Sequence, residues 1–219
     1  MQKVPVESLG LFEQLDRTVV AFLKKKPSPN PDNFYVSISA EDYEKKKEEF
    51  EKSGYQAVKL PLGMALDNVI QQPSFQNLVI GGLYMVDIFV PKEELMPLKD
   101  LVDSFCIMFA AANNRIENIK AYDLMKSKTV YFIGKLFTDN PQPGDEVSFE
   151  GLNRETAEGS YEAVKCFLTR ESAEKYNSKN RPVTAANLEH LKHFWGKPLI
   201  VEPHRNYWIE FLKKKERSI

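Results

Sequence analysis

The pattern of hydrophobic and polar residues predicts two similar β-hairpins, one in each half of the chain. In residues 197–211 a short apolar run, 199–201, precedes polar turn residues and an alternating segment that ends at Phe211. Alternation with a period of two is typical of a strand with one buried face. Residues 77–90 repeat this scheme around Gly81-Gly82. We expect a tight primed turn at this glycine pair, because such turns require positive φ.

The remaining periodicity predicts further short strands and helices in the same order in both halves. Apolar runs of strand period alternate with segments in which apolar residues recur every three or four positions. The expected strands are 18–23, 34–38, 56–60, 129–133 and 162–168. The expected helices are 8–16, 39–53, 63–71, 93–112, 116–125, 172–176 and 184–194, with a basic tail at 212–217.

This shared order indicates an internal duplication. We predict an α+β fold of two tandem repeats, each a mixed sheet with short helices, joined by a central apolar helix. The expected boundaries are 1–92 for the first repeat, 93–112 for the joining helix and 113–219 for the second repeat. The second repeat carries an insertion at 138–160, whose polar part we expect to form a loop or a mobile hairpin arm.

Composition and charge are those of an ordinary soluble globular protein. Hydrophobic residues make up 42% of the 219 residues, charged residues 28%, and the net charge is −1. A near-neutral chain has no global basic field for nucleic acid, so no nucleic-acid partner is expected. The N-terminus has no apolar signal segment and no apolar run reaches the length of a membrane span, which predicts a cytoplasmic protein.

Residues 164–176 resemble a segment of the SseB-like family, named for enhanced serine sensitivity. In that family a strand, a Thr or Ser, and a small helix ending in an aromatic residue follow one another, as Phe167, Thr169 and Tyr176 do here. Residues 188–203 resemble the family's next helix and a strand that ends in Asn-Pro, although Glu202 stands where the family has Asn. The resemblance implies a bacterial cytoplasmic protein and supplies no catalytic residues.

Histidines and cysteines are the first candidates for chemistry. His190 and His193 are three residues apart on a predicted helix, but a zinc site needs about four ligands and no further motif accompanies them. They remain weak metal candidates against the alternative of exposed helix residues. Cys106 and Cys166 have apolar neighbours, which favours buried reduced thiols over nucleophiles. No cofactor motif is present, so no cofactor is expected.

The tip of the second hairpin has the composition most typical of a binding site. His204, Arg205, Tyr207 and Trp208 combine cations and aromatic rings, which are favoured in interaction hot spots. The alternative is that the aromatic residues of a closing strand pack inside the fold. The glycine pair of the first hairpin offers no counterpart to this tip.

The sequence therefore predicts a protein-interaction or regulatory module without catalytic activity, whose partner is a protein and which is able to form homo-oligomers. The alternative is a small-ligand-binding protein or an enzyme with a site in the cleft between the repeats.

Overall fold

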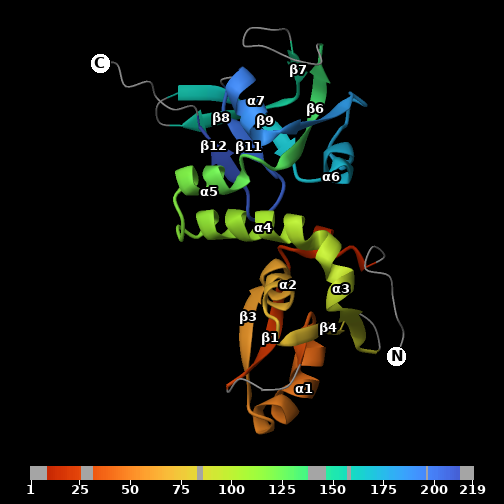
Figure 1. Ribbon diagram of the computed structural model, residues 1–219. Coiled ribbons are helices and arrows are strands. Elements are labelled where there is room, and N and C mark those ends of the chain that lie inside the picture. Colours follow the sequence, from red (N-terminus) through yellow and green to blue (C-terminus); the bar gives the residue numbers. More distant parts are fainter. Residues whose placement is uncertain are drawn as a thin grey trace. The chain divides into compact units, whose positions relative to one another are not determined.

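The computed structural model describes residues 9–25, 32–82, 86–137, 147–156, 159–195 and 197–212. The chain forms two compact units, unit 1 (Met1–Cys106) and unit 2 (Ile107–Ile219). Figure 1 colours unit 1 from red to yellow-green and unit 2 from green to blue. Except for Leu212, the basic tail expected at the C-terminus lies outside the described residues. No helix among the described residues is long and apolar enough to cross a membrane.

Unit 1 contains a mixed sheet of five strands in the order β3-β1-β2-β4-β5. Strands β2 and β4 run parallel, while the other neighbouring pairs are antiparallel. The strands are β1 (Thr18–Lys24), β2 (Asp32–Ser37), β3 (Tyr55–Pro61), β4 (Phe75–Gly81) and β5 (Ile88–Pro91).

Unit 2 repeats this topology in the order β10-β6-β9-β11-β12, again with a single parallel pair in this row, β9 and β11. The predicted duplication of a mixed α+β unit is thereby confirmed, strand for strand. The strands are β6 (Thr129–Leu136), β9 (Gly159–Phe167), β10 (Val183–Asn187), β11 (Leu199–Val201) and β12 (Ile209–Phe211).

The insertion of unit 2 enlarges its sheet to seven strands. Strand β7 (Val147–Phe149) pairs with β6, and β8 (Gly151–Thr156) pairs with β9. Glu150 lies between them and bridges both neighbours, because its N–H donates to Ile133 and its carbonyl accepts from the N–H of Lys165. The stretch expected as a loop or a mobile hairpin arm is therefore largely strand β8, which forms a hairpin with β9. At Gly134 a side chain would lie 1.9 Å from a carbonyl oxygen of β7, so glycine permits this close approach.

Helices connect the strands as the caps in the sequence indicate. Helix α1 (Ala40–Lys52) starts after Ser39, whose Oγ accepts a hydrogen bond from the N–H of Asp42, and stops before Gly54 at φ +81°. The other helices of unit 1 are the short 3₁₀ turn η2 (Phe12–Gln14) and α2 (Leu62–Gln71); those of unit 2 are α5 (Asn118–Met125), α6 (Arg170–Lys175) and α7 (Leu188–Trp195).

The central apolar helix is built from three consecutive pieces. Helix α3 (Lys92–Leu95) passes into a 3₁₀ turn, η3 (Met96–Leu98), and then into α4 (Lys99–Ala112). Pro97 lies in the 3₁₀ piece, where the missing N–H of proline costs little. The boundary between the units falls inside α4, between Cys106 and Ile107.

Three local predictions are wrong. The Gly81-Gly82 pair is not a tight turn, because the closing pair of the hairpin is Ile80 and Ile88, with seven residues between them in the chain. The loop of the second hairpin, 202–208, has the same length, because Val201 pairs with Ile209. Helix 184–194 begins only at Leu188, since residues 183–187 are needed as strand β10. The helix predicted at 8–16 is reduced to the turn η2.

Gly63→Ala tests the packing between α2 and α4. A β-carbon at Gly63 would lie 2.2 Å from the ring of Phe105, which is fully buried. Alanine normally favours a helix, but here the clash outweighs this gain, and we expect unfolding to become easier by about 1–3 kcal/mol. Urea denaturation measures the change. In the alanine background, Phe105→Leu should cost less than it does in the wild type; equal costs would contradict the clash.

Candidate functional site

Two residues of the predicted binding tip lie beside α6. His204 is exposed, with its ring stacked on Tyr176 at a centroid distance of 3.8 Å. Partial burial lowers the pKa of His204, and the nearby Lys165 lowers it further. The side chain of Arg205 is only 10% exposed, and its Nε lies 3.3 Å from Oε2 of Glu202. Of these two side chains, that of His204 is exposed to solvent, while that of Arg205 is largely buried.

The other two predicted residues pack in different places in unit 2. Tyr207 packs edge-on against Phe109, with ring centroids 4.9 Å apart. Trp208 lies under the guanidinium group of Arg154, which is 4.9 Å from the ring centroid. The loop therefore carries the four residues close together in the chain, but their side chains contact four separate partners.

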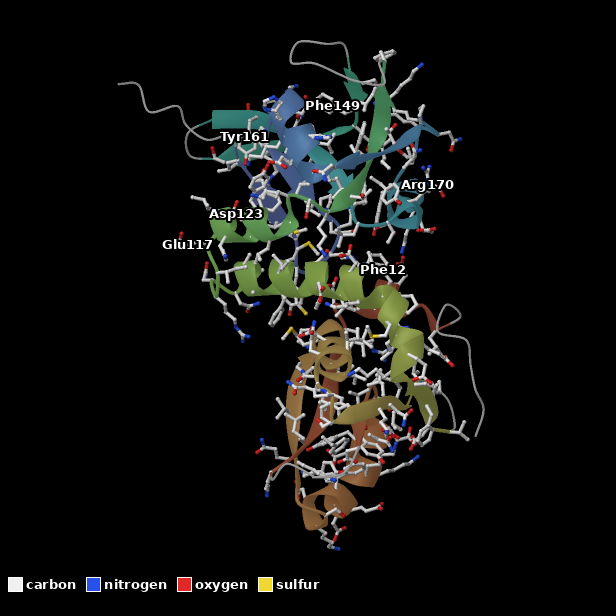
Figure 2. All side chains as sticks on the ribbon, in the orientation of Figure 1. Phe12, Glu117, Asp123, Phe149, Tyr161 and Arg170 are labelled. Atoms are coloured by element: carbon white, nitrogen blue, oxygen red, sulfur yellow. The ribbon has the colours of Figure 1, made fainter. Side chains whose placement is uncertain are left out.

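The environment of Trp208 is a polar cluster on the sheet of unit 2. The Nε of Arg154 lies 3.7 Å from Oε2 of Glu210, and the hydroxyl of Tyr161 donates to Oε1 of the same carboxylate at 2.9 Å. Tyr161 lies on β9 and is labelled in Figure 2. Glu210, on β12, therefore holds the guanidinium group of Arg154, on β8, against the ring of Trp208. The indole is half-buried.

Glu202 anchors the loop of the second hairpin to α6. Its side chain is buried, with 1% exposed, and its backbone has φ +54°, which non-glycine residues rarely adopt. The carboxylate accepts hydrogen bonds from the N–H of Leu168 at 2.7 Å and from the hydroxyl of Ser172 at 3.3 Å. Burial raises the pKa of Glu202, and the positive charge of Arg205 and these hydrogen bonds oppose the rise.

In unit 1 a carboxylate fills the equivalent place from the helix instead of from the loop. Asp42, in the first turn of α1, accepts a hydrogen bond from the hydroxyl of Ser37, and its Oδ1 lies 3.0 Å from Nζ of Lys46. A β-carbon at Gly81 would lie 2.3 Å from Oδ2 of Asp42. A larger residue at the start of this loop would therefore displace the carboxylate.

The carboxylate thus comes from the helix in unit 1 and from the hairpin loop in unit 2. Gly81 and Glu202 each follow the closing pair of a hairpin, while Asp42 and Ser172 each lie three residues after a helix cap. Unit 1 combines an acidic helix residue with a glycine in the loop, and unit 2 combines serine on the helix with an acidic loop residue. In both, the carboxylate lies where two parallel strands end and a helix begins, which is a common place for ligands in sheets with parallel strands.

The histidine and cysteine candidates are not brought into a cluster. His190 and His193 are both exposed on α7. Among the residues that the structure describes, no three His, Cys, Asp or Glu side chains are arranged to hold a metal ion. Burial raises the pKa of Cys106 to about 12 and also raises the pKa of Cys166, which is opposite to what a reactive thiol needs.

Unit 1 carries a groove of about 280 Å³ at the end of the sheet where β1 stops and β2, β3 and β4 start. Aromatic rings form its apolar wall, and Phe34 and Phe75 meet edge to face at 5.0 Å. Side-chain amides form much of the polar part. The aromatic members are Phe22, Phe34, Tyr55 and Phe75, and the amides are Asn33, Asn68 and Gln72.

An ion pair between Lys24 and Asp32 lies in this groove. The hydrogen bond to Asp32 raises the pKa of Lys24, while partial burial and the same aspartate raise the pKa of Tyr55. The Nζ of Lys24 also lies 5.4 Å from the ring centroid of Tyr55. The groove therefore presents one cation, one anion and several amides against an aromatic wall.

Sequence reasoning missed the groove and the two carboxylates beside the parallel strand pairs. Tyr55, Asn68 and Phe75 come from three different elements, and no local pattern joins them. Glu202 carried one signal in the sequence, because it stands where the resembled family has Asn.

The raised pKa of Glu202 makes stability depend on pH in a defined direction. A carboxyl group whose folded pKa lies above its ordinary value of 4.5 contributes stability below that value and loses it as the pH rises through the folded pKa. Glu202→Gln cannot ionise and should not show this loss. We expect the wild type to lose stability relative to Glu202→Gln as the pH rises from 4.5. Urea denaturation at several pH values measures this, and the opposite slope would show that Arg205 dominates.

Transplanting the arrangement of unit 1 into unit 2 tests the exchange. Glu202→Gly leaves the N–H of Leu168 and the charge of Arg205 without their acceptor, and we expect a loss of about 2–4 kcal/mol in the free energy of unfolding. Adding Ser172→Asp should restore part of this loss, because the new carboxylate lies where Asp42 lies in unit 1. A double variant less stable than Glu202→Gly alone would refute the equivalence.

Comparison with known proteins adds no family. No family model matches this sequence, and no curated protein matches it. A solved structure described as Anabaena Tic22 (protein transport) aligns over 83% of this chain and 82% of its own, with 12% identity and a TM-score of 0.23. A similarity at that TM-score carries no argument about the fold or the function of this chain.

Proposed function

We propose that this chain is a non-catalytic, SseB-like protein-interaction module, and that the groove of unit 1 is its contact surface. The observation that carries the proposal is the lining of the groove, in which an aromatic wall faces amides and an ion pair. Aromatic rings supply contact area at low entropic cost, and amides pair with the backbone of a bound polypeptide. The partner is therefore a protein segment that inserts a side chain between Phe34, Phe75 and the amides.

Two features of unit 2 support the SseB-like part of the proposal. Strand β9, the cap Thr169 and helix α6 follow one another as the resemblance implies, and Tyr176 ends the helix. Glu202 has φ +54° at the position where the family has Asn, a residue that adopts this left-handed conformation more readily than most. The backbone at this point thus suits the family's residue.

The size of the groove suits a side chain of a partner and also a small ligand. Sites for small molecules usually enclose about 300–1,000 Å³, and the groove, at about 280 Å³, lies close to the lower end of this range. A small-ligand-binding protein is the second candidate function, because Lys24 and Asp32 supply charges of both signs for a polar ligand. Both functions use the same groove, and the experiment below separates them.

Ser74→Arg tests the groove as a contact surface. Ser74 lines the groove and is exposed, so arginine fills the groove without changing the core. Ser53→Arg is the matched control, since Ser53 is an equally exposed serine at the end of α1, outside the groove lining. A photo-crosslinking amino acid at Gln72 identifies the bound molecule in extracts of the native organism by mass spectrometry.

We expect the crosslinked molecule to be a protein, with Ser74→Arg weakening its binding at least about tenfold and Ser53→Arg leaving it unchanged. Crosslinks only to small molecules would favour the second candidate. Equal binding by both variants would exclude the groove as the contact surface.

A further inference from the structure

Strand β3 forms an open edge of the sheet in unit 1. Its inner side pairs with β1, and the ladder is bounded by hydrogen bonds from the N–H of Lys25 to Gly54 and from the N–H of Leu62 to Arg17. Bonding alternates along an antiparallel pair, so every second residue of β3 directs its backbone outward. The residues whose N–H and C=O groups point away from β1 are Tyr55, Ala57 and Lys59. Within the described ranges no strand pairs with this side of β3.

The equivalent edge of unit 2 is shorter and partly occupied. Strand β10 has five residues, against seven in β3. By the same alternation Val183 points its carbonyl outward, and Nη1 of Arg170 donates to this oxygen at 3.2 Å. Figure 2 labels Arg170 at the start of α6. Natural proteins cover sheet edges in this way to prevent pairing. For β3 no side chain among the described residues makes such a bond to the outward backbone.

We propose that β3 pairs with β3 of a second copy of this chain, antiparallel and about a twofold axis at Ala57. In this register Ala57 lies opposite Ala57 of the second copy, and Tyr55 lies opposite Lys59 of the second copy. All three are outward-facing residues, so each pair exchanges two backbone hydrogen bonds. The arrangement joins the two five-stranded sheets into one continuous sheet and closes on itself as a symmetric dimer.

The side chains along β3 suit this self-pairing. Ala57 is exposed and is the smallest side chain of the strand, so nothing obstructs the axis. Lys59 lies opposite the half-buried ring of Tyr55 and not opposite another lysine, so like charges do not face each other and the lysine stem covers the ring. Pro61 has no N–H and ends the ladder after Lys59. The paired segment is thus limited to three hydrogen-bonded residue pairs.

The mass of the full-length chain in solution tests the dimer. Sedimentation equilibrium from micromolar to submillimolar concentrations should show the mass rising towards twice that of one chain. Ala57→Pro removes an outward N–H and leaves the hydrogen bonds to β1 intact, so we expect the dissociation constant to rise at least about tenfold. Ala185→Pro is the matched control, because Ala185 is also exposed and outward-facing, but on β10, and should leave the dimer unchanged.

A wild-type chain that stays monomeric throughout this range overturns the proposal. So does an Ala57→Pro variant that dimerises like the wild type, or a loss of dimer affinity that is equal in both proline variants. A second measurement covers the case in which Ala57→Pro does not fold, as judged by circular dichroism. Ala57→Cys should be crosslinked between copies by a short bismaleimide, whereas Ala185→Cys should not. Equal crosslinking of the two cysteine variants also overturns the proposal, which stands independently of the groove.

Discussion

A carboxylate beside each parallel strand pair provides the interaction on which both units depend, buried in unit 2 and partly buried in unit 1. A mixed sheet of this topology ends two parallel strands at the N-terminus of a helix, where backbone N–H groups need acceptors. In unit 2 the Glu202 carboxylate accepts from the N–H of Leu168, just before α6. In unit 1 the hydroxyl of Ser39 caps α1, and the Asp42 carboxylate accepts from the hydroxyl of Ser37 and pairs with Lys46. The same carboxylates tie the hairpin loop to the helix, so the fold fills with its own side chain a place that other folds leave for ligands.

The two units share the same order of five strands and differ in the elements and side chains around it. Unit 2 adds β7 and β8, encloses Trp208 under Arg154 and covers its edge with Arg170. Unit 1 has a groove at the end of its sheet, and no strand of its described residues pairs with the outer edge of β3. The groove and the β3 edge thus belong to unit 1, while one outward carbonyl of the equivalent edge in unit 2 is bonded to Arg170.

The candidate site shows the limit of local reasoning most clearly. Residues 204–208 have the composition of a binding tip, yet Tyr207 and Trp208 each contact a partner distant in the sequence, and Arg205 pairs with the buried Glu202. Composition shows which chemical groups are available. It does not show that Glu202 accepts a hydrogen bond from the N–H of Leu168, or that Arg154 lies above the indole of Trp208. Hot-spot residues and packed residues are chemically the same, so only burial and partners distinguish them.

The sequence by itself determined the α+β class, the order of the elements and the duplication, because hydrophobic period, caps and breakers act within a few residues. The helix expected at 39–53 is α1, and the hydroxyl of Ser39 caps it locally through the N–H of Asp42. Only the tertiary structure decided the seven-residue hairpin loops, strand β10 in place of the first turn of a helix, and the insertion of β7 and β8. These features follow from pairing between distant strands, where backbone hydrogen bonding overrides local preference. The same pairing decided which edge was left open.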